Sequence, residues 1–347
     1  MGLIDFLFNT DPHSVSEERD RGRELLAELT QKKLRPHQAS WCVQLIKRGV
    51  DPNLVEESTG RTALTLAAEK GHANIALALL EKGADINAQD RDGWTALAHA
   101  AKEGQTKMLQ TLIEKGANID AQDNWGWTAL YWAIFHGQSD AALTLIEKGA
   151  DVNTRNTGGV SLIDYAMKRD IPEIIIAIIN SDIDVNMQCR DGKTLLMNTA
   201  SLSKSIDTTL ALIEKGADIH ARNEKGETAI ICAARTSHTD AILALIKSGA
   251  DVNAQDNDGK TALMYAADNG HTPTILALVD NGADPALTDN EDKTAEHMSK
   301  RHRLSYDFAK TTQSRYTAYI KKTFRNAAKE GTRHTRKIRR PKKNAAP

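Results

Sequence analysis

Two Gly-Lys-Thr triplets are the nearest approach of this chain to a catalytic motif. Gly192-Lys193-Thr194 and Gly259-Lys260-Thr261 resemble the end of a phosphate-binding loop. Such a loop also needs a glycine five residues upstream so that its backbone can wrap the phosphates, and this chain has Met187 and Ala254 at those places. The triplets therefore indicate turns, and we expect no nucleotide site.

No other set of reactive side chains favours an enzyme. The eleven histidines are scattered, and no His-Glu-x-x-His is present, so the sequence predicts no metal site. The three cysteines, Cys42, Cys189 and Cys232, have no paired spacing and indicate reduced thiols. We expect a non-enzymatic protein without a cofactor.

Aromatic side chains gather in one stretch of a chain that is otherwise poor in them. Only 5% of the residues are aromatic, yet four of the five tryptophans fall in the stretch from Trp94 to Trp132. Because exposed aromatic side chains are enriched where proteins bind one another, this stretch is a candidate partner-binding surface. The alternative interpretation is that the indole rings stack between turns, or that Trp132 fills the core. The candidate aromatic residues are Trp94, Trp125, Trp127, Tyr131, Trp132, Phe135 and His136, bordered by Lys102, Lys168 and Arg169.

Charge is divided unevenly along the chain. Residues 1–292 hold 28 Lys and Arg against 43 Asp and Glu, whereas residues 293–347 hold 17 against 3. The end of the chain is therefore a basic tail, which favours either a solvated terminus, contact with a polyanion (nucleic acid or an anionic membrane), or a nuclear import signal. The tail residues of interest are Arg333, Arg336, Lys337, Arg339, Arg340, Lys342 and Lys343.

The same division of charge suggests a contact within the chain. The basic tail can fold back onto acidic turn residues and compete there with a partner. These acidic residues are Asp90, Asp92, Asp123, Asp256 and Asp258.

All of these residues belong to a unit that recurs along the chain. Gly-Ala-Asp or a near copy precedes a short variable turn, and a Thr or Ser then opens the next apolar segment. A fixed period indicates a stack of equal units, each with two short helices and a hairpin-like loop, here called a finger. The spacing of the opening residues is constant, except that the gap before Thr228 is longer by a single residue. The opening residues are Thr62, Thr95, Thr128, Ser161, Thr194, Thr228, Thr261 and Thr294.

The repeated strings resemble the ankyrin repeat over roughly residues 35–300. The resemblance rests on the period, on Thr62–Ala68 followed by Gly71-His72, and on Gly249–Ala254. It implies an all-α solenoid of helix-turn-helix units with β-hairpin-like fingers, and a protein–protein interaction scaffold or adaptor. It also implies docking on the finger tips and on the concave face of the inner helices. The Pro and His of the family's Thr-Pro-Leu-His helix start are absent, so we expect stability to depend more on apolar packing between repeats.

The period also predicts how the chain is divided. We expect a flexible N-terminus, a helical cap, seven repeats, a second cap with an amphipathic helix, and a disordered tail. The expected boundaries are 1–13, 14–57, 58–290 (repeats 58–90, 91–123, 124–156, 157–189, 190–223, 224–256 and 257–289), 291–329 and 330–347.

Repeats four to six lack the glycine at which the inner helix ends, and the fifth repeat has an extra residue within Ser201–Ser205. This glycine, for example Gly71 or Gly270, stands where the backbone favours a positive φ. Asp170 replaces it in the fourth repeat and Ser237 in the sixth, and holding a non-glycine residue in that conformation costs about 1 kcal/mol. The sequence therefore predicts a locally softer middle of the stack.

The sequence also bears on location. No run of 18 hydrophobic residues is present, and the start of the chain lacks a basic segment, so we expect neither a membrane span nor a secretory signal. We expect a cytoplasmic monomer that binds another protein. Nuclear import through the tail, or delivery into a host cell if the source is an intracellular bacterium, is left open.

Overall fold

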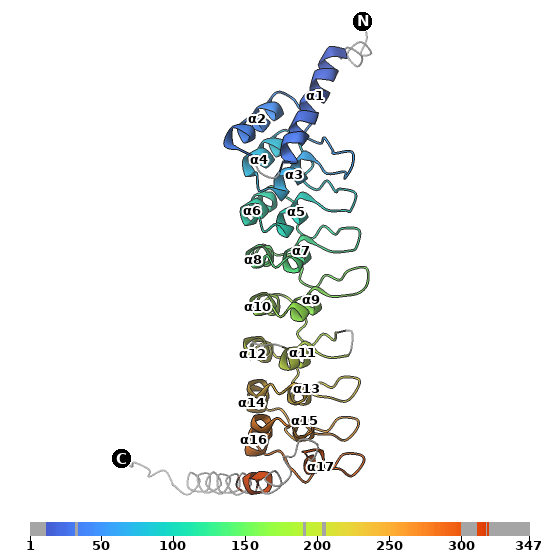
Figure 1. Ribbon diagram of the computed structural model, residues 1–347, viewed down its shortest axis with the longest axis vertical. Coiled ribbons are helices and arrows are strands. Elements are labelled where there is room, and N and C mark those ends of the chain that lie inside the picture. The colour runs from blue at the N-terminus through green and yellow to red at the C-terminus, as the bar shows by residue number, and fades with distance from the viewer. Residues whose placement is uncertain are drawn as a thin grey trace, which may run out of the picture. The chain divides into compact units, whose positions relative to one another are not determined.

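The computed structural model describes residues 12–31, 34–189, 192–202, 206–299, 311–316 and 318. The chain forms two compact units, Met1–Ile183 and Asp184–Pro347. In both units the described elements are short helices joined by fingers, and the fingers carry isolated antiparallel bridges, such as those between Val55 and Thr62 or between Gln255 and Thr261 (Figure 1).

The first unit begins with two helices that differ from the rest. These are α1 (Pro12–Leu29) and α2 (Pro36–Lys47), which pack on each other. Helix α1 starts at Pro12, and proline fits the first turn of a helix, where a backbone N–H has no partner.

The remaining helices of the first unit alternate between an inner row beside the fingers and an outer row (Figure 1). Neighbours pack within each row, as α3 does on α5 and α4 on α6, and α1 and α2 pack on the first members of the two rows. The inner helices are α3 (Ala63–Glu69), α5 (Ala96–Lys102), α7 (Ala129–Phe135) and α9 (Leu162–Arg169). The outer helices are α4 (Ala73–Glu81), α6 (Thr106–Glu114), α8 (Ser139–Glu147) and α10 (Pro172–Asn180).

The second unit repeats this arrangement. The inner helices are α11 (Leu195–Leu202), α13 (Ala229–Thr236), α15 (Ala262–Asp268) and α17 (Ala295–Ser299), and the outer helices are α12 (Ile206–Glu214), α14 (Thr239–Lys247) and α16 (Thr272–Asp280). Residues 311–316 are helical, and Arg315 forms an ion pair with Asp280 of α16. Most of the expected C-terminal amphipathic helix lies outside the described residues.

The inner helices start and pack as the residue types require. The Thr62 hydroxyl accepts a hydrogen bond from the backbone N–H of Thr65 at 3.1 Å, which satisfies a donor that the helix itself leaves free. Ala67, Ala100 and Ala133 on three successive inner helices are fully buried, and their small side chains let the helices approach closely. The predicted all-α architecture of stacked helix pairs is therefore confirmed in each unit.

The turns after two inner helices have the conformation that the sequence predicts. Asp170 has a φ of 51° and Ser237 a φ of 67°, close to the 73° of Gly71 at the equivalent place. Both residues therefore adopt the left-handed conformation in which a Cβ atom is strained.

Candidate functional site

In the first unit, aspartate side chains tie the fingers to the inner helices. One carboxylate oxygen of Asp123 accepts two backbone N–H groups of its own finger, each at 2.9 Å. The other accepts the indole N–H of Trp132 on α7 at 2.8 Å. One repeat earlier, Asp90 Oδ2 lies 2.8 Å from Nε2 of His99 on α5. These bonds hold two aromatic rings against the base of the fingers.

The Asp90 carboxylate is buried in its charged form. Burial raises its pKa, but the hydrogen bonds from His99 and from finger N–H groups together lower it by more, so the pKa of Asp90 lies below its ordinary value. Its side chain is only 4% exposed. An anion held in this way is part of the scaffold.

The idea that the tail contacts five acidic finger residues is therefore wrong for three of them. Asp90, Asp123 and Asp256 all direct their carboxylates inward, and Asp256 accepts the hydroxyl of Tyr265 at 2.7 Å. Asp92 and Asp258 are exposed.

A connected set of rings, here called the aromatic cluster, extends from these aspartate pairs over three repeats. Trp94 lies over Trp132, with ring centroids 4.2 Å apart. Tyr131 stacks on Trp127 with centroids 3.5 Å apart, and its ring centroid is 5.0 Å from that of Tyr165 on α9. The members of the aromatic cluster are Trp94, His99, Trp127, Tyr131, Trp132, Phe135, His136 and Tyr165.

Solvent reaches these rings to different degrees. Trp127 and Tyr131 are 8% and 6% exposed, so the expectation that both present open rings is wrong. Their face-to-face stack lies nearly parallel, at 7°, and each ring shields the other from water. Phe135 is 39% exposed, and Trp132 is partly buried, so Trp132 lies between the two alternatives of an open ring and a core residue. The cluster thus has a buried floor and an accessible edge.

Two of the predicted residues stand apart from the cluster. The indole of Trp125 is 48% exposed, although its backbone carbonyl accepts the N–H of Thr157 at 2.9 Å. Lys168 is an exposed residue near the end of α9. Over the described ranges, neither side chain makes a ring or cation–π contact with the aromatic cluster.

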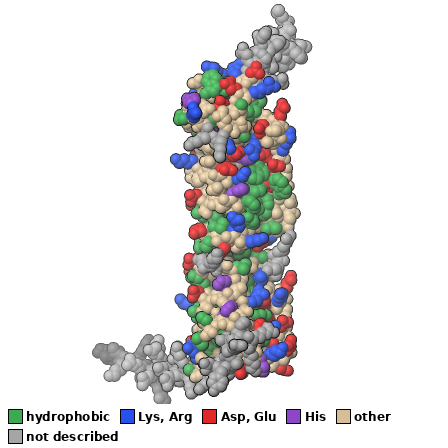
Figure 2. All heavy atoms as spheres, in the orientation of Figure 1, with side chains coloured by type: hydrophobic (Ala, Val, Ile, Leu, Met, Phe, Trp, Pro, Cys, Tyr) green, Lys and Arg blue, Asp and Glu red, His purple; other side chains and the backbone are tan. Residues whose placement is uncertain are grey.

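Basic side chains border the accessible edge. The ammonium group of Lys102 lies 5.6 Å from the ring centroid of Trp94. Burial lowers the pKa of His136 most, and the charge of Lys102 lowers it further. Glu103 raises it, and Arg169 adds a lowering effect smaller than that of Glu103. Two cations therefore act on His136 together. In Figure 2, hydrophobic side chains gather at the level of α5 to α9 with basic side chains close by.

Sequence reasoning missed two members of the cluster, His99 and Tyr165. They lie one repeat before and one repeat after Trp132, at the same place on the inner helices of the adjacent repeats. A comparison of equivalent places across the repeats would have found this column, whereas a search for neighbouring tryptophans could not.

The basic tail and the Gly-Lys-Thr triplets lie away from the aromatic cluster in the sequence. The tail residues Arg333 to Lys343 lie outside the described residues. Thr194 and Thr261 of the Gly-Lys-Thr triplets accept backbone N–H groups at the starts of α11 and α15, so the triplets are finger turns. Within the described ranges, no group of three His, Cys, Asp or Glu side chains could hold a metal ion, and no helix is long and apolar enough to cross a membrane.

Comparison with known families agrees with this architecture. A family model described as ankyrin repeats (3 copies) matches residues 7–90, 33–123, 85–156, 162–256 and 199–289. These stretches together cover well over half of the chain, and they include the helix pairs of both units. The chain therefore belongs to the ankyrin repeat family.

Proposed function

We propose that this protein is a non-enzymatic adaptor whose partner protein binds the accessible edge of the aromatic cluster. Ankyrin repeats are in general protein–protein interaction modules, and proteins built from them are typically non-enzymatic scaffolds. The observation that carries the proposal is the juxtaposition of the exposed Phe135 and His136 with the cations Lys102 and Arg169.

The buried part of the cluster supports this role because it holds the accessible part still. Trp132 is fixed by its hydrogen bond to Asp123, and its ring centroid lies 5.6 Å from that of Phe135. A partner side chain then meets rings that are already ordered, so less conformational entropy is lost on binding. Aromatic side chains with a well-packed floor are typical centres of binding energy in protein interfaces.

The charged side chains at the accessible edge indicate which kind of peptide would bind there. Lys102 and Arg169 bring positive charge to the edge. Lys102 Nζ lies 3.7 Å from Glu103 Oε1, so this pair is partly neutralised and the net charge of the three residues is positive through Arg169. Electrostatic complementarity therefore favours a segment with an apolar or aromatic anchor flanked by Asp or Glu. Trp125, exposed on the neighbouring finger, would extend this contact.

Peptide selection on the intact chain tests the proposal. We expect selected peptides to carry an aromatic or leucine anchor with acidic neighbours, and their affinity to fall about tenfold or more in Phe135→Ala. Leu243→Ala is the matched control, since Leu243 on α14 is similarly exposed, at 41%, and lies in the other unit. Peptides that bind Phe135→Ala and Arg169→Ala as tightly as the unchanged protein would overturn the proposal.

The net charge of +14 over residues 293–347 favours a second function, in which the tail engages nucleic acid or an anionic membrane. The same variants separate the two functions. Phe135→Ala weakens the binding of the peptide and leaves the binding of a polyanion intact.

A further inference from the structure

Three finger aspartates share one hydrogen-bond arrangement, and a fourth has only part of it. In three fingers, one carboxylate oxygen accepts backbone N–H groups two and four residues later, and the other accepts a donor on the side chain nine residues later. The pairs of aspartate and donor are Asp90 with His99, Asp123 with Trp132, and Asp256 with Tyr265, at 2.8, 2.8 and 2.7 Å.

Asp289, in the last finger, keeps only the first half of this arrangement. Its Oδ1 accepts the backbone N–H groups of Glu291 and Lys293, both at 2.9 Å. The residue nine positions later is Met298, whose thioether has no proton to donate. Asp289 is only 6% exposed, and no group of the described residues donates to its Oδ2. Its Oδ2 therefore keeps an acceptor position that water or a bound donor can fill.

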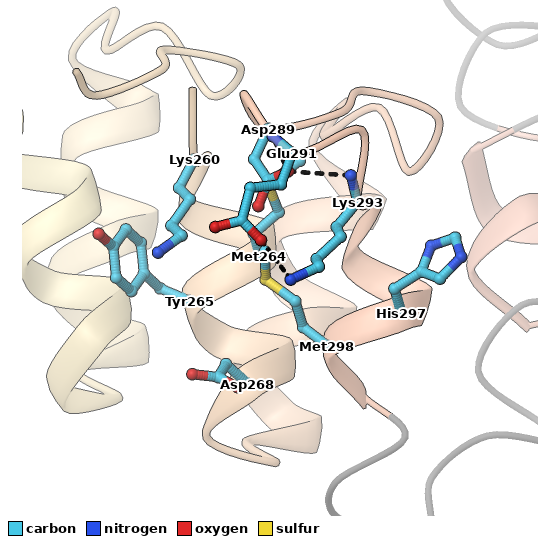
Figure 3. Close-up of a pocket in the computed structure, with 9 residues that line it drawn as sticks. All are labelled: Lys260, Met264, Tyr265, Asp268, Asp289, Glu291, Lys293, His297 and Met298. Atoms are coloured by element: carbon cyan, nitrogen blue, oxygen red, sulfur yellow. Dashed lines mark hydrogen bonds and ion pairs between the residues drawn. The ribbon is translucent and has the colours of Figure 1, made fainter. Parts of the chain in front are cut away.

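This carboxylate lines a cavity of about 400 Å³ in the second unit. Figure 3 shows the Asp289 side chain extending from the finger toward Met264 of α15, with Met298 of α17 on the same cavity. The ring of Tyr265 and the carboxylate of Asp268 also line the space. The cavity thus combines the apolar side chains of Met264 and Met298 and the ring of Tyr265 with charged side chains, among them the largely buried Asp289.

The two lysines of the cavity have acidic neighbours of their own. The Lys293 ammonium group pairs with Glu291, as the dashed line in Figure 3 marks. The Lys260 Nζ lies 3.7 Å from Asp258 Oδ2 and 5.9 Å from the centroid of the Tyr265 ring.

We propose that this cavity binds the guanidinium group of an arginine side chain presented by a peptide, with Asp289 Oδ2 as the acceptor. A charged donor makes the stronger hydrogen bond to a carboxylate. Arginine suits these walls better than lysine because its planar group is more weakly hydrated and stacks on apolar and aromatic surfaces. The peptide is either the tail of this same chain, which holds four arginines between Arg333 and Arg340, or a segment of another protein.

The site is distinct from the aromatic cluster and does not depend on it. Its residues come from the last repeat and the C-terminal cap of the second unit, whereas the cluster lies wholly in the first. Failure of either proposal therefore leaves the other standing.

Methyl NMR of Met264 and Met298 tests the proposal directly. The probe is N-acetyl-arginine methylamide, and the control ligand is the citrulline analogue, which has the same shape and no charge. The protein is the full-length chain with Arg333, Arg336, Arg339 and Arg340 replaced by Gln, so that the tail cannot compete. We expect a saturable shift of both methyl signals with arginine and none with citrulline. No saturable shift with arginine, or an equal shift with citrulline, overturns the proposal.

Matched variants assign the effect to Asp289. Asp289→Asn should weaken arginine binding about tenfold or more, whereas Asp292→Asn, which alters an exposed acid of the same finger that does not line the cavity, should not. Met298→His supplies the donor that His99 provides in its own repeat, and it should block binding, with Met264 as the reporter. Met298→Leu should still bind. Two variants are used so that the test survives if one of them folds poorly. A folded Asp289→Asn or Met298→His protein that binds arginine as tightly as the chain without that substitution contradicts the proposal.

The unchanged chain distinguishes the two sources of the arginine. If its Met264 and Met298 signals already lie at the bound positions and move when the four tail arginines are replaced, the tail occupies the cavity. If the signals do not move on that replacement, but added arginine shifts them in both chains, the occupant is another protein.

Discussion

The indole N–H of Trp132 donates to the carboxylate of Asp123 at 2.8 Å, joining an inner helix to the finger nine residues before it. The same carboxylate accepts the backbone N–H groups of Trp125 and Trp127. One buried anion therefore sets the shape of a finger, the start of the Trp127–Tyr131 stack, and the position of a partly exposed ring. The scaffold and the proposed binding surface are connected through a single side chain.

Replacing Asp123 by Ala should destabilise the protein more than the loss of an ordinary surface charge. Three donors lose their acceptor, and Trp127 is buried, so we expect the free energy of unfolding to fall by about 2–3 kcal/mol. Urea unfolding followed by tryptophan fluorescence measures the change. Asp92→Ala, at an exposed finger position, is the control and should stay within about 0.5 kcal/mol. Equal effects of the two variants would show that the buried bonds contribute little.

The repeat architecture could be predicted because every repeat meets the same neighbours. The Thr or Ser at the start of each inner helix, the buried Ala residues, and the glycine-like turn are required in each copy, so their regular recurrence reveals them. Even the departures were predictable. Asp170 and Ser237 take a positive φ because the next helix can start only if the chain turns there.

The candidate site could be predicted only in part, because burial depends on packing between copies. Trp127 occupies a finger position that is charged in four other repeats, yet it is buried because Tyr131 offers a parallel ring at 3.5 Å. The link between Asp123 and Trp132 crosses a turn, so neither the helical period of 3.6 nor the strand period of 2 signals it. Only the comparison of equivalent places in several repeats reveals such pairs.

Binding of an acidic peptide at the aromatic cluster should strengthen as the pH falls. The pKa of His136 lies below its ordinary value in the free protein, so the imidazole is neutral near neutral pH. An acidic partner favours the imidazolium and raises this pKa, so binding takes up a proton. Affinity should therefore increase several-fold between about pH 7.5 and about pH 5.5, around the ordinary histidine pKa of about 6.5. Calorimetric titration measures this. His136→Gln should remove the pH dependence, and its persistence would assign it to another group.

Deleting residues 330–347 should remove binding to polyanions and leave binding of the peptide at the cluster intact. The deletion removes seven Lys and Arg residues, and each cation that contacts a phosphate or sulfate group adds to the salt dependence of binding. Elution from heparin along a salt gradient measures the first effect, and peptide titration measures the second. Unchanged elution would leave the tail without a polyanion role. A change in peptide affinity or in its salt dependence would instead indicate that the tail competes with the partner.

Exchanging residues at two equivalent turns should shift stability in opposite directions. Ser237 has a φ of 67°, and its buried hydroxyl has no hydrogen-bond partner among the described residues, so Ser237→Gly removes strain without breaking a bond. The relief of about 1–2 kcal/mol exceeds the cost of about 0.4–1 kcal/mol from the freer unfolded chain, so we expect a gain of up to about 1 kcal/mol.

The reverse change, Gly270→Ser, lies at the equivalent turn of the next repeat in the same unit, at a φ of 72°, and should lower stability by a similar amount. Hydrogen exchange of α13 and α15 reports each turn locally. Ser237→Gly should slow exchange in α13, and Gly270→Ser should speed it in α15. The same sign of change in both variants would mean that backbone strain does not govern these turns.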